Sequence, residues 1–109
     1  MDLNSLRENV REYLGKNISI ESPLMIDVNG NIFLSDRSFN NEFKVVINFN
    51  DIIEKLETEM TCTVGAPDIK FCDDASVQGK LVSVDDEYQL VDLSGLVLDF
   101  GRGEQLRII

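Results

Sequence analysis

Carboxylates are the most frequent chemically active side chains in this sequence, and they include two short runs. Asp73–Asp74 follows an apolar stretch, and Asp85–Asp86–Glu87 separates two others. Oxygen ligands of this kind suit Mg²⁺, but adjacent residues on a strand point to opposite faces, so neither run is predicted to chelate unless a turn gathers it. Two carboxylates about 5–10 Å apart across a cleft can cleave glycosidic bonds. No such pair is indicated by the spacing, and the chain has no Trp for a sugar platform.

Other reactive groups are scarce. The chain has no His, which removes the commonest general base and nucleophile partner. Cys62 and Cys72 cannot supply a four-ligand zinc site. They are expected to be reduced core residues, or to face each other on adjacent strands where a disulfide is possible in an oxidising compartment. The Gly-Arg-Gly segment at 101–103 lacks the other residues of a phosphate loop, and the segment 27–31 lacks calcium-loop spacing. We therefore predict no enzyme, no metal and no cofactor.

Charge is the strongest global signal. Twenty acids and ten bases give a net charge of −10. Seven acids and five bases lie up to Asn50, and thirteen acids and five bases follow, so the halves carry −2 and −8. A negative field repels phosphate and attracts basic protein surfaces. We expect a basic protein partner and no direct binding to nucleic acid or membrane, although a negative surface can also serve solubility alone.

The sequence predicts two amphipathic helices. The first has capping-box spacing at Ser5 and Glu8 and ends at Gly15. The second is capped by Asn50 or Asp51. Their apolar stripes have helical spacing and comprise Leu3, Leu6, Val10, Tyr13 and Leu14 in the first, and Phe49, Ile52, Ile53, Leu56 and Met60 in the second.

The remaining segments predict strands. Asn29–Gly30 is typical of a type I′ hairpin turn, the run 43–49 resembles a buried strand, and short apolar runs separated by Gly, Pro or Asp follow Thr61. We expect one α+β domain over 1–109, with both helices on an antiparallel sheet and a C-terminal half that forms an all-β meander or small barrel. No apolar run is long enough to span a bilayer, and the start lacks signal-peptide character. The expected location is the cytoplasm.

The last forty or so residues resemble the Sm-like small-barrel family. The similarity to its first signature rests on Ile69, Phe71, Asp73, Val77, Gly79, Leu81, Val84, Asp85, Leu90 and Leu93, and to its second on Arg102–Gly103, Leu106 and Ile109. The resemblance implies RNA contacts at Glu87, Gln89 and Arg102, and assembly into a ring. Tyr88–Gln89 replaces the Met-Asn pair of the family, and Glu87 would repel phosphate.

The combined interpretation is a small acidic inhibitor of the immunity-protein, antitoxin or phage-inhibitor type. Such a monomer or dimer would occlude a basic, nucleic-acid-handling site on a partner, with carboxylates pairing to Arg or Lys. The predicted partner-binding residues are Asp73, Asp74, Asp85, Asp86, Glu87 and Asp92, with Tyr88 as apolar anchor. Two alternatives stay open: an adaptor domain within a larger assembly, and the RNA-binding Sm-like ring.

Overall fold

The fold was analysed in a computed structural model that describes residues 1–36, 43–48, 52–62, 68–101 and 103–109. Its helices are α1 (Leu3–Glu8), α2 (Val10–Tyr13) and α3 (Ile53–Glu59). Its strands are β1 (Asn17–Asp27), β2 (Ile32–Leu34), β3 (Val45–Ile47), β4 (Ile69–Val84), β5 (Glu87–Gly101) and β6 (Glu104–Arg107). No helix in these ranges is long and apolar enough to cross a membrane.

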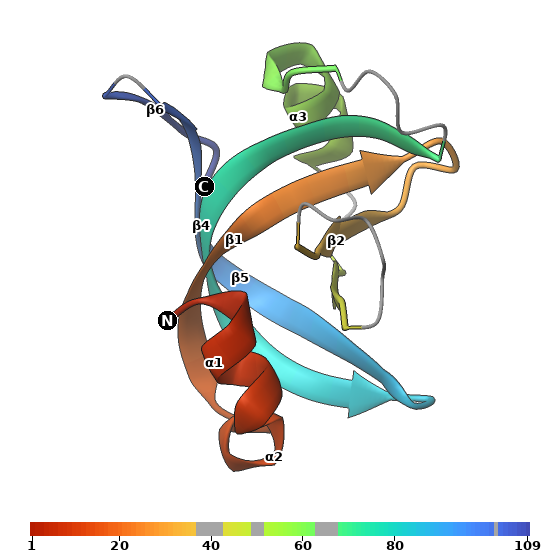
Figure 1. The fold of residues 1–109 in the computed structure, drawn as a ribbon, viewed down its shortest axis with the longest axis vertical. Helices are drawn as coiled ribbons and strands as arrows, with labels where there is room; N and C mark the ends of the chain where they lie inside the picture. The colour runs from red at the N-terminus through yellow and green to blue at the C-terminus, as the bar shows by residue number, and fades with distance from the viewer. Residues whose placement is uncertain (37–42, 49–51, 63–67, 102) are drawn as a thin grey trace.

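The strands form a closed barrel with one strand added outside the ring. The sheet order is β3-β2-β1-β4-β5-β6, and β3 also pairs with β5 in parallel, which closes a ring of five strands. β6 extends the sheet beyond β5, and the long strands β1 and β4 curve together around the barrel (Figure 1). A Greek-key barrel of five strands, with a helix between its third and fourth strands, has the connectivity of OB-fold barrels. The small barrel predicted for the C-terminal half thus includes β1 to β3 as well.

Alternation of side chains along β1 and β4 builds the core. Even-numbered residues of β1 and odd-numbered residues of β4 point inward, so Ile20 and Val77 are fully buried while Glu21 and Gln78 are exposed. The core cluster also takes in α1 through Leu6, α3 through Leu56 and β5 through Leu98. A smaller cluster on the outer face contains Met25, Phe33, Ile69 and Cys72.

A close approach between β4 and β5 accompanies the change of register between them. The register shifts between Gln78 and Lys80, opposite Asp92, which has φ +50°. A Cβ atom on Gly79 would lie 2.8 Å from Leu93 Cδ2 and 3.0 Å from the Val91 carbonyl oxygen. Only glycine leaves room for this contact, so close packing between β4 and β5 explains the glycine in the Gly79-x-Leu81 segment.

The two predicted amphipathic helices are not confirmed. The first segment divides into α1 and α2 because Asn9 leaves the helical region at φ −131°. Asp2, not Ser5, is the N-cap of α1, and its Oδ1 accepts a hydrogen bond from the Ser5 N–H at 2.8 Å. The second segment is the seven-residue α3, and the caps predicted for it at 50 and 51 lie outside the described residues. The described members of both apolar stripes do pack in or against the core, but the helices are too short to cover the sheet. Phe49 of the second stripe lies outside the described residues.

The turn predicted at Asn29–Gly30 differs in type from the one observed, and a type I′ turn occurs elsewhere. At Asn29–Gly30 only Gly30 has positive φ, at +84°, and the Gly30 N–H donates to the Asp27 carbonyl. This is a type I turn followed by a left-handed glycine, so the predicted type I′ turn is wrong here. The two-residue connection between β4 and β5 has positive φ at both Asp85 (51°) and Asp86 (64°), which is the type I′ arrangement.

Cys72 is buried as expected, Cys62 is exposed and not a core residue, and no disulfide joins the two. Cys62 forms an isolated bridge opposite Phe71, so Cys72 is one residue out of register with it and points to the other face of the sheet. The pairing that the sequence left open is therefore not made.

Candidate functional site

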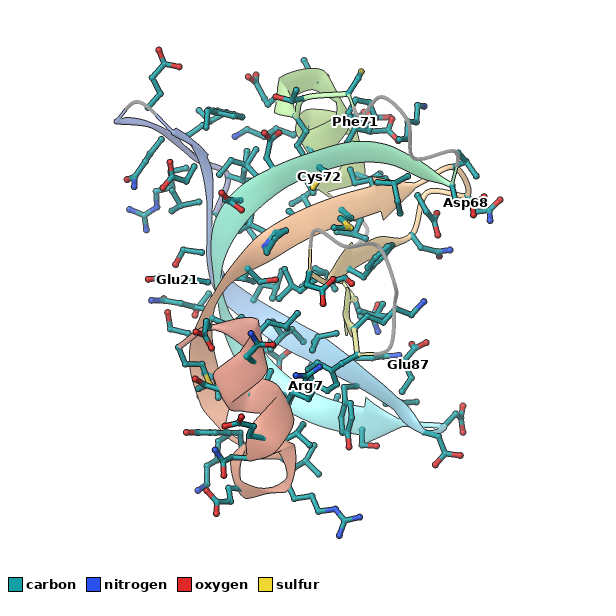
Figure 2. The ribbon with its side chains drawn as sticks, in the orientation of Figure 1. Arg7, Glu21, Asp68, Phe71, Cys72 and Glu87 are labelled. Atoms are coloured by element: carbon teal, nitrogen blue, oxygen red, sulfur yellow. The ribbon has the colours of Figure 1, made fainter. Side chains whose placement is uncertain are left out.

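A hollow of about 580 Å³ on the outer face of the sheet gathers carboxylates from distant parts of the chain. It spans β1, β4, β5 and β6, and its lining includes Asp2, Glu21, Asp74 and Asp99. Figure 2 shows Glu21 pointing away from the barrel on this side. The middle of the hollow is less polar, because Pro23, Ala75 and Val97 also line it.

Cross-strand register explains why these residues meet. Pro23 of β1 lies opposite Asp74, and Asp74 lies opposite Asp99 of β5. Asp99 in turn faces Gln105 of β6. Directly opposite residues in an antiparallel pair share one face, so this row runs straight across the outer surface.

A second row, two residues along, completes the hollow. Glu21 lies opposite Ser76, which lies opposite Val97. Asp2 forms a parallel bridge with Glu21, and the Glu21 N–H donates to the Met1 carbonyl at 2.8 Å. The N-terminal residues thereby add a carboxylate at the β1 edge.

The described charged residues that line the hollow are all acidic, although Arg107 lies opposite Val97 at its β6 side. Among the described residues, no lysine or arginine lines it. Like charges directly opposite each other in a sheet are mutually destabilising, and Asp74 and Asp99 are such a pair. Backbone hydrogen bonding to Ser5, followed by the Ser5 side chain, lowers the pKa of Asp2, so this carboxylate is ionised at neutral pH. Together these carboxylates favour the approach of a cationic group.

Asp73, predicted to contact a partner, is buried at 8% exposure. Its Oδ2 accepts a hydrogen bond of 2.6 Å from the backbone N–H of Thr61. This contact ties the chain after α3 to β4, which is a structural role. Asp73 therefore belongs to the interior and not to a binding surface.

The other predicted acids occupy two separate places. Asp74 lies in the hollow, whereas Asp85, Asp86 and Glu87 are exposed at the tip of the β4–β5 hairpin. Figure 2 shows Glu87 near this tip, away from Glu21. Asp92 is exposed at the bulge in β5. The residues proposed from the sequence therefore do not form one face.

Tyr88, the predicted anchor, is half-buried. Its ring centroid lies 5.7 Å from that of Phe43 at a tilted angle, and it packs against the core. Tyr88 also pairs with Val45 across the parallel β3–β5 contact that closes the barrel. Much of the Tyr88 ring therefore packs against residues of its own chain.

Sequence reasoning missed Asp2, Glu21 and Asp99 as a group. Each is a single acid in its own segment, and nothing local distinguishes it from a solvated surface residue. The signal that joins them is the pairing of β1 with β4 and of β4 with β5, which no short stretch of sequence encodes.

The surface that OB-fold barrels use for oligonucleotides lies over strands 2 and 3 and the β1–β2 and β4–β5 loops. Here the β4–β5 loop is Asp85–Asp86, and the Phe33 ring is 3% exposed beneath the Lys44 ammonium, 5.2 Å from its centroid. Among the residues that the structure describes on this face, neither an exposed stacking ring nor a row of cations is present. In the described ranges no group of three or more His, Cys, Asp or Glu residues is placed to hold a metal ion.

No family model, curated protein or solved structure matches the chain. The resemblance to the Sm-like family therefore gains no support from these comparisons, and the function must be inferred from the site itself.

Proposed function

We propose that this protein is an acidic binding protein whose outer-face hollow receives a basic surface of another protein. The observation that carries the proposal is the convergence of Asp2, Glu21, Asp74 and Asp99 around one concavity. Such a protein would occupy a site that otherwise handles nucleic acid, as immunity proteins, antitoxins and phage inhibitors do. The expected location of such an inhibitor is the cytoplasm.

Binding of this kind needs both electrostatic attraction and apolar contact, and the hollow supplies both. Its carboxylates stand in for phosphates and attract Arg or Lys, which raises association rates by ~10–10³-fold at low ionic strength. Charge alone seldom sets residence time, which depends on desolvated apolar contact. Pro23 and Val97 provide apolar surface for the stem of a long cationic side chain.

The acidic tip of the β4–β5 hairpin is the competing location on this molecule. Asp85, Asp86 and Glu87 are exposed there, but they come from one turn and enclose no concavity. A flat, solvated charge cluster contributes little to affinity. The tip is expected to assist steering, with the hollow forming the bound contact.

Three matched triple variants test the proposal. Glu21→Gln, Asp74→Asn and Asp99→Asn neutralise the hollow while keeping side-chain size and an acceptor oxygen. Asp85→Asn, Asp86→Asn and Glu87→Gln neutralise the tip, and Glu8→Gln, Glu12→Gln and Glu59→Gln neutralise exposed acids on the helices. Each set removes three negative charges, which takes the net charge from −10 to −7.

Affinity of each variant for an arginine-rich peptide and for a basic nuclease is measured by calorimetry at several salt concentrations. We expect the hollow variant to bind at least about tenfold more weakly at low salt and to show a shallower salt dependence, since buried charge contacts are worth more than exposed ones. The helix variant should stay near wild type. An equal loss in all three variants would mean that only bulk charge attracts the probe, and the proposed site would be wrong.

The occlusion step has its own test. A basic protein retained from host extract by the wild type, and lost with the hollow variant, should be released by added nucleic acid. Simultaneous binding of nucleic acid and this protein to that partner would contradict occlusion.

A further inference from the structure

The edge of β6 is an unpaired sheet edge. β6 is the last strand in the sheet order and pairs only with β5. The hairpin that carries it projects beyond the barrel (Figure 1). Within the described part of the chain, no hydrogen bond satisfies the side of Glu104–Arg107 that faces away from β5. Such an edge offers backbone donors and acceptors to another strand.

The register between β5 and β6 identifies which backbone N–H and C=O groups of β6 point away from β5. The Ile108 N–H donates to the Leu96 carbonyl at 2.8 Å and the Leu96 N–H donates to the Ile109 carbonyl at 3.5 Å, so Leu96 directs both of its backbone groups toward the strand that contains β6. Hydrogen-bonded pairs alternate in an antiparallel ladder, which makes Leu98 and Leu106 the next such pair along the register. The N–H and C=O groups of Gln105 and Arg107 therefore point away from β5.

The side chains along this edge are complementary to themselves. In an antiparallel pairing of two β6 strands about a two-fold axis, opposite residues must lie on the same face of the sheet. Because side chains alternate between faces, two opposite residues must both be odd-numbered or both be even-numbered. The free groups pair when Gln105 lies opposite Arg107 of the second copy. Leu106 then lies opposite Leu106 of the second copy, on the inner face. Shifting the register by one step places Arg107 opposite itself, which repulsion disfavours.

The same register brings opposite charges together. Within one molecule Gln105 lies opposite Asp99, and Arg107 lies opposite Val97, which makes it a diagonal neighbour of Asp99. Arg107 of the second copy would extend the row that contains Asp74 and Asp99, so each Asp99 would lie near one arginine from each copy. Two strand spacings, about 10 Å, separate its backbone from that of Asp99. An extended arginine and an aspartate together span this distance, and the symmetry makes the contact twice.

We infer that this chain forms a two-fold dimer by pairing β6 with β6 of a second copy, with Gln105 opposite Arg107. Four backbone hydrogen bonds, one leucine pair and two Arg107–Asp99 contacts hold it. An interface of this size is at the weak, reversible end for proteins, with a dissociation constant on the order of 10–100 µM. A two-fold axis perpendicular to the sheet leaves both acidic hollows on the same side.

Sedimentation velocity between about 10 µM and 1 mM tests the dimer directly. Gln105→Pro removes an outward N–H and leaves the β5 ladder intact, since proline is tolerated on a strand edge. We expect this variant to stay folded by circular dichroism and to be monomeric throughout the range. The matched control Gln105→Ala removes the side chain, keeps the N–H and should still dimerise.

Charge exchange tests the register. Arg107→Glu should weaken the dimer about tenfold, because two contacts become repulsive. Adding Asp99→Arg to that variant should restore most of the loss. A wild type that is monomeric at the highest concentration would overturn the inference. So would a dimer that survives Gln105→Pro, or one that the exchanged pair fails to rescue.

Discussion

Replacing the β4–β5 turn residues Asp85 and Asp86 by Asn and Gly is expected to stabilise the protein. Both aspartates have positive φ, at 51° and 64°. The left-handed region costs an L-residue roughly 1–2 kcal/mol, and somewhat less for Asp or Asn. Asn-Gly is the pair that suits a type I′ turn best.

The magnitude follows from opposing contributions. Removing the β-carbon at Asp86 recovers about 1 kcal/mol of backbone strain. Glycine reduces this gain by about 0.4–1 kcal/mol, because it increases the conformational freedom of the unfolded chain. Replacing Asp85 by Asn removes repulsion between like charges at an exposed turn, which adds a few tenths of a kcal/mol to the free energy of unfolding. The expected net gain in the free energy of unfolding is about 0.3–0.9 kcal/mol, or a rise in Tm of roughly 1–7 °C for a domain of this size.

Urea denaturation followed by circular dichroism measures this gain. The matched control is Asp85→Ala with Asp86→Ala, which removes the same charges but keeps both β-carbons in the left-handed region. We expect the control to be no more stable than wild type. If the Asn-Gly and Ala-Ala variants are equally stable, positive φ is not the origin of the effect and the reasoning is wrong.

Two further predictions concern the other turn and the β4–β5 contact. Partial burial works to raise the pKa of Asp27, but hydrogen bonds from the Asn31 N–H and side-chain amide and from the Asn29 N–H outweigh it, so its pKa is lowered. A lowered pKa stabilises the folded state above the unfolded pKa near 3.8, and this stability is lost as the pH falls through the folded pKa. Between pH 6 and 2, the free energy of unfolding should therefore fall more steeply for wild type than for Asp27→Asn. Parallel curves for the two proteins would contradict this. Gly79→Ala should lower stability by about 1–3 kcal/mol because the Val91 carbonyl lies 3.0 Å from the new Cβ. The control Gly95→Ala meets only the movable Gln78 side chain, at 3.1 Å, and equal losses in the two variants would show that close approach to backbone does not matter.

Local patterns in the sequence determined much of the secondary structure. Helical spacing placed Leu6 and Leu56 in the core. The short apolar runs expected after Thr61 are instead joined into the long strands β4 and β5. The composition also fixed the negative charge and the absence of histidine. These features depend on neighbours within a few residues, so a single chain displays them directly.

Tertiary structure alone decided how those elements combine. The closure of the barrel by β3 and β5 depends on contacts between segments far apart in the sequence. The same holds for the candidate site. Asp73 and Asp74 are neighbours in sequence, yet one binds the Thr61 N–H inside and the other lines the outer hollow. A one-residue step along a strand reverses the face of a side chain, and only the register between strands determines which acids then lie side by side.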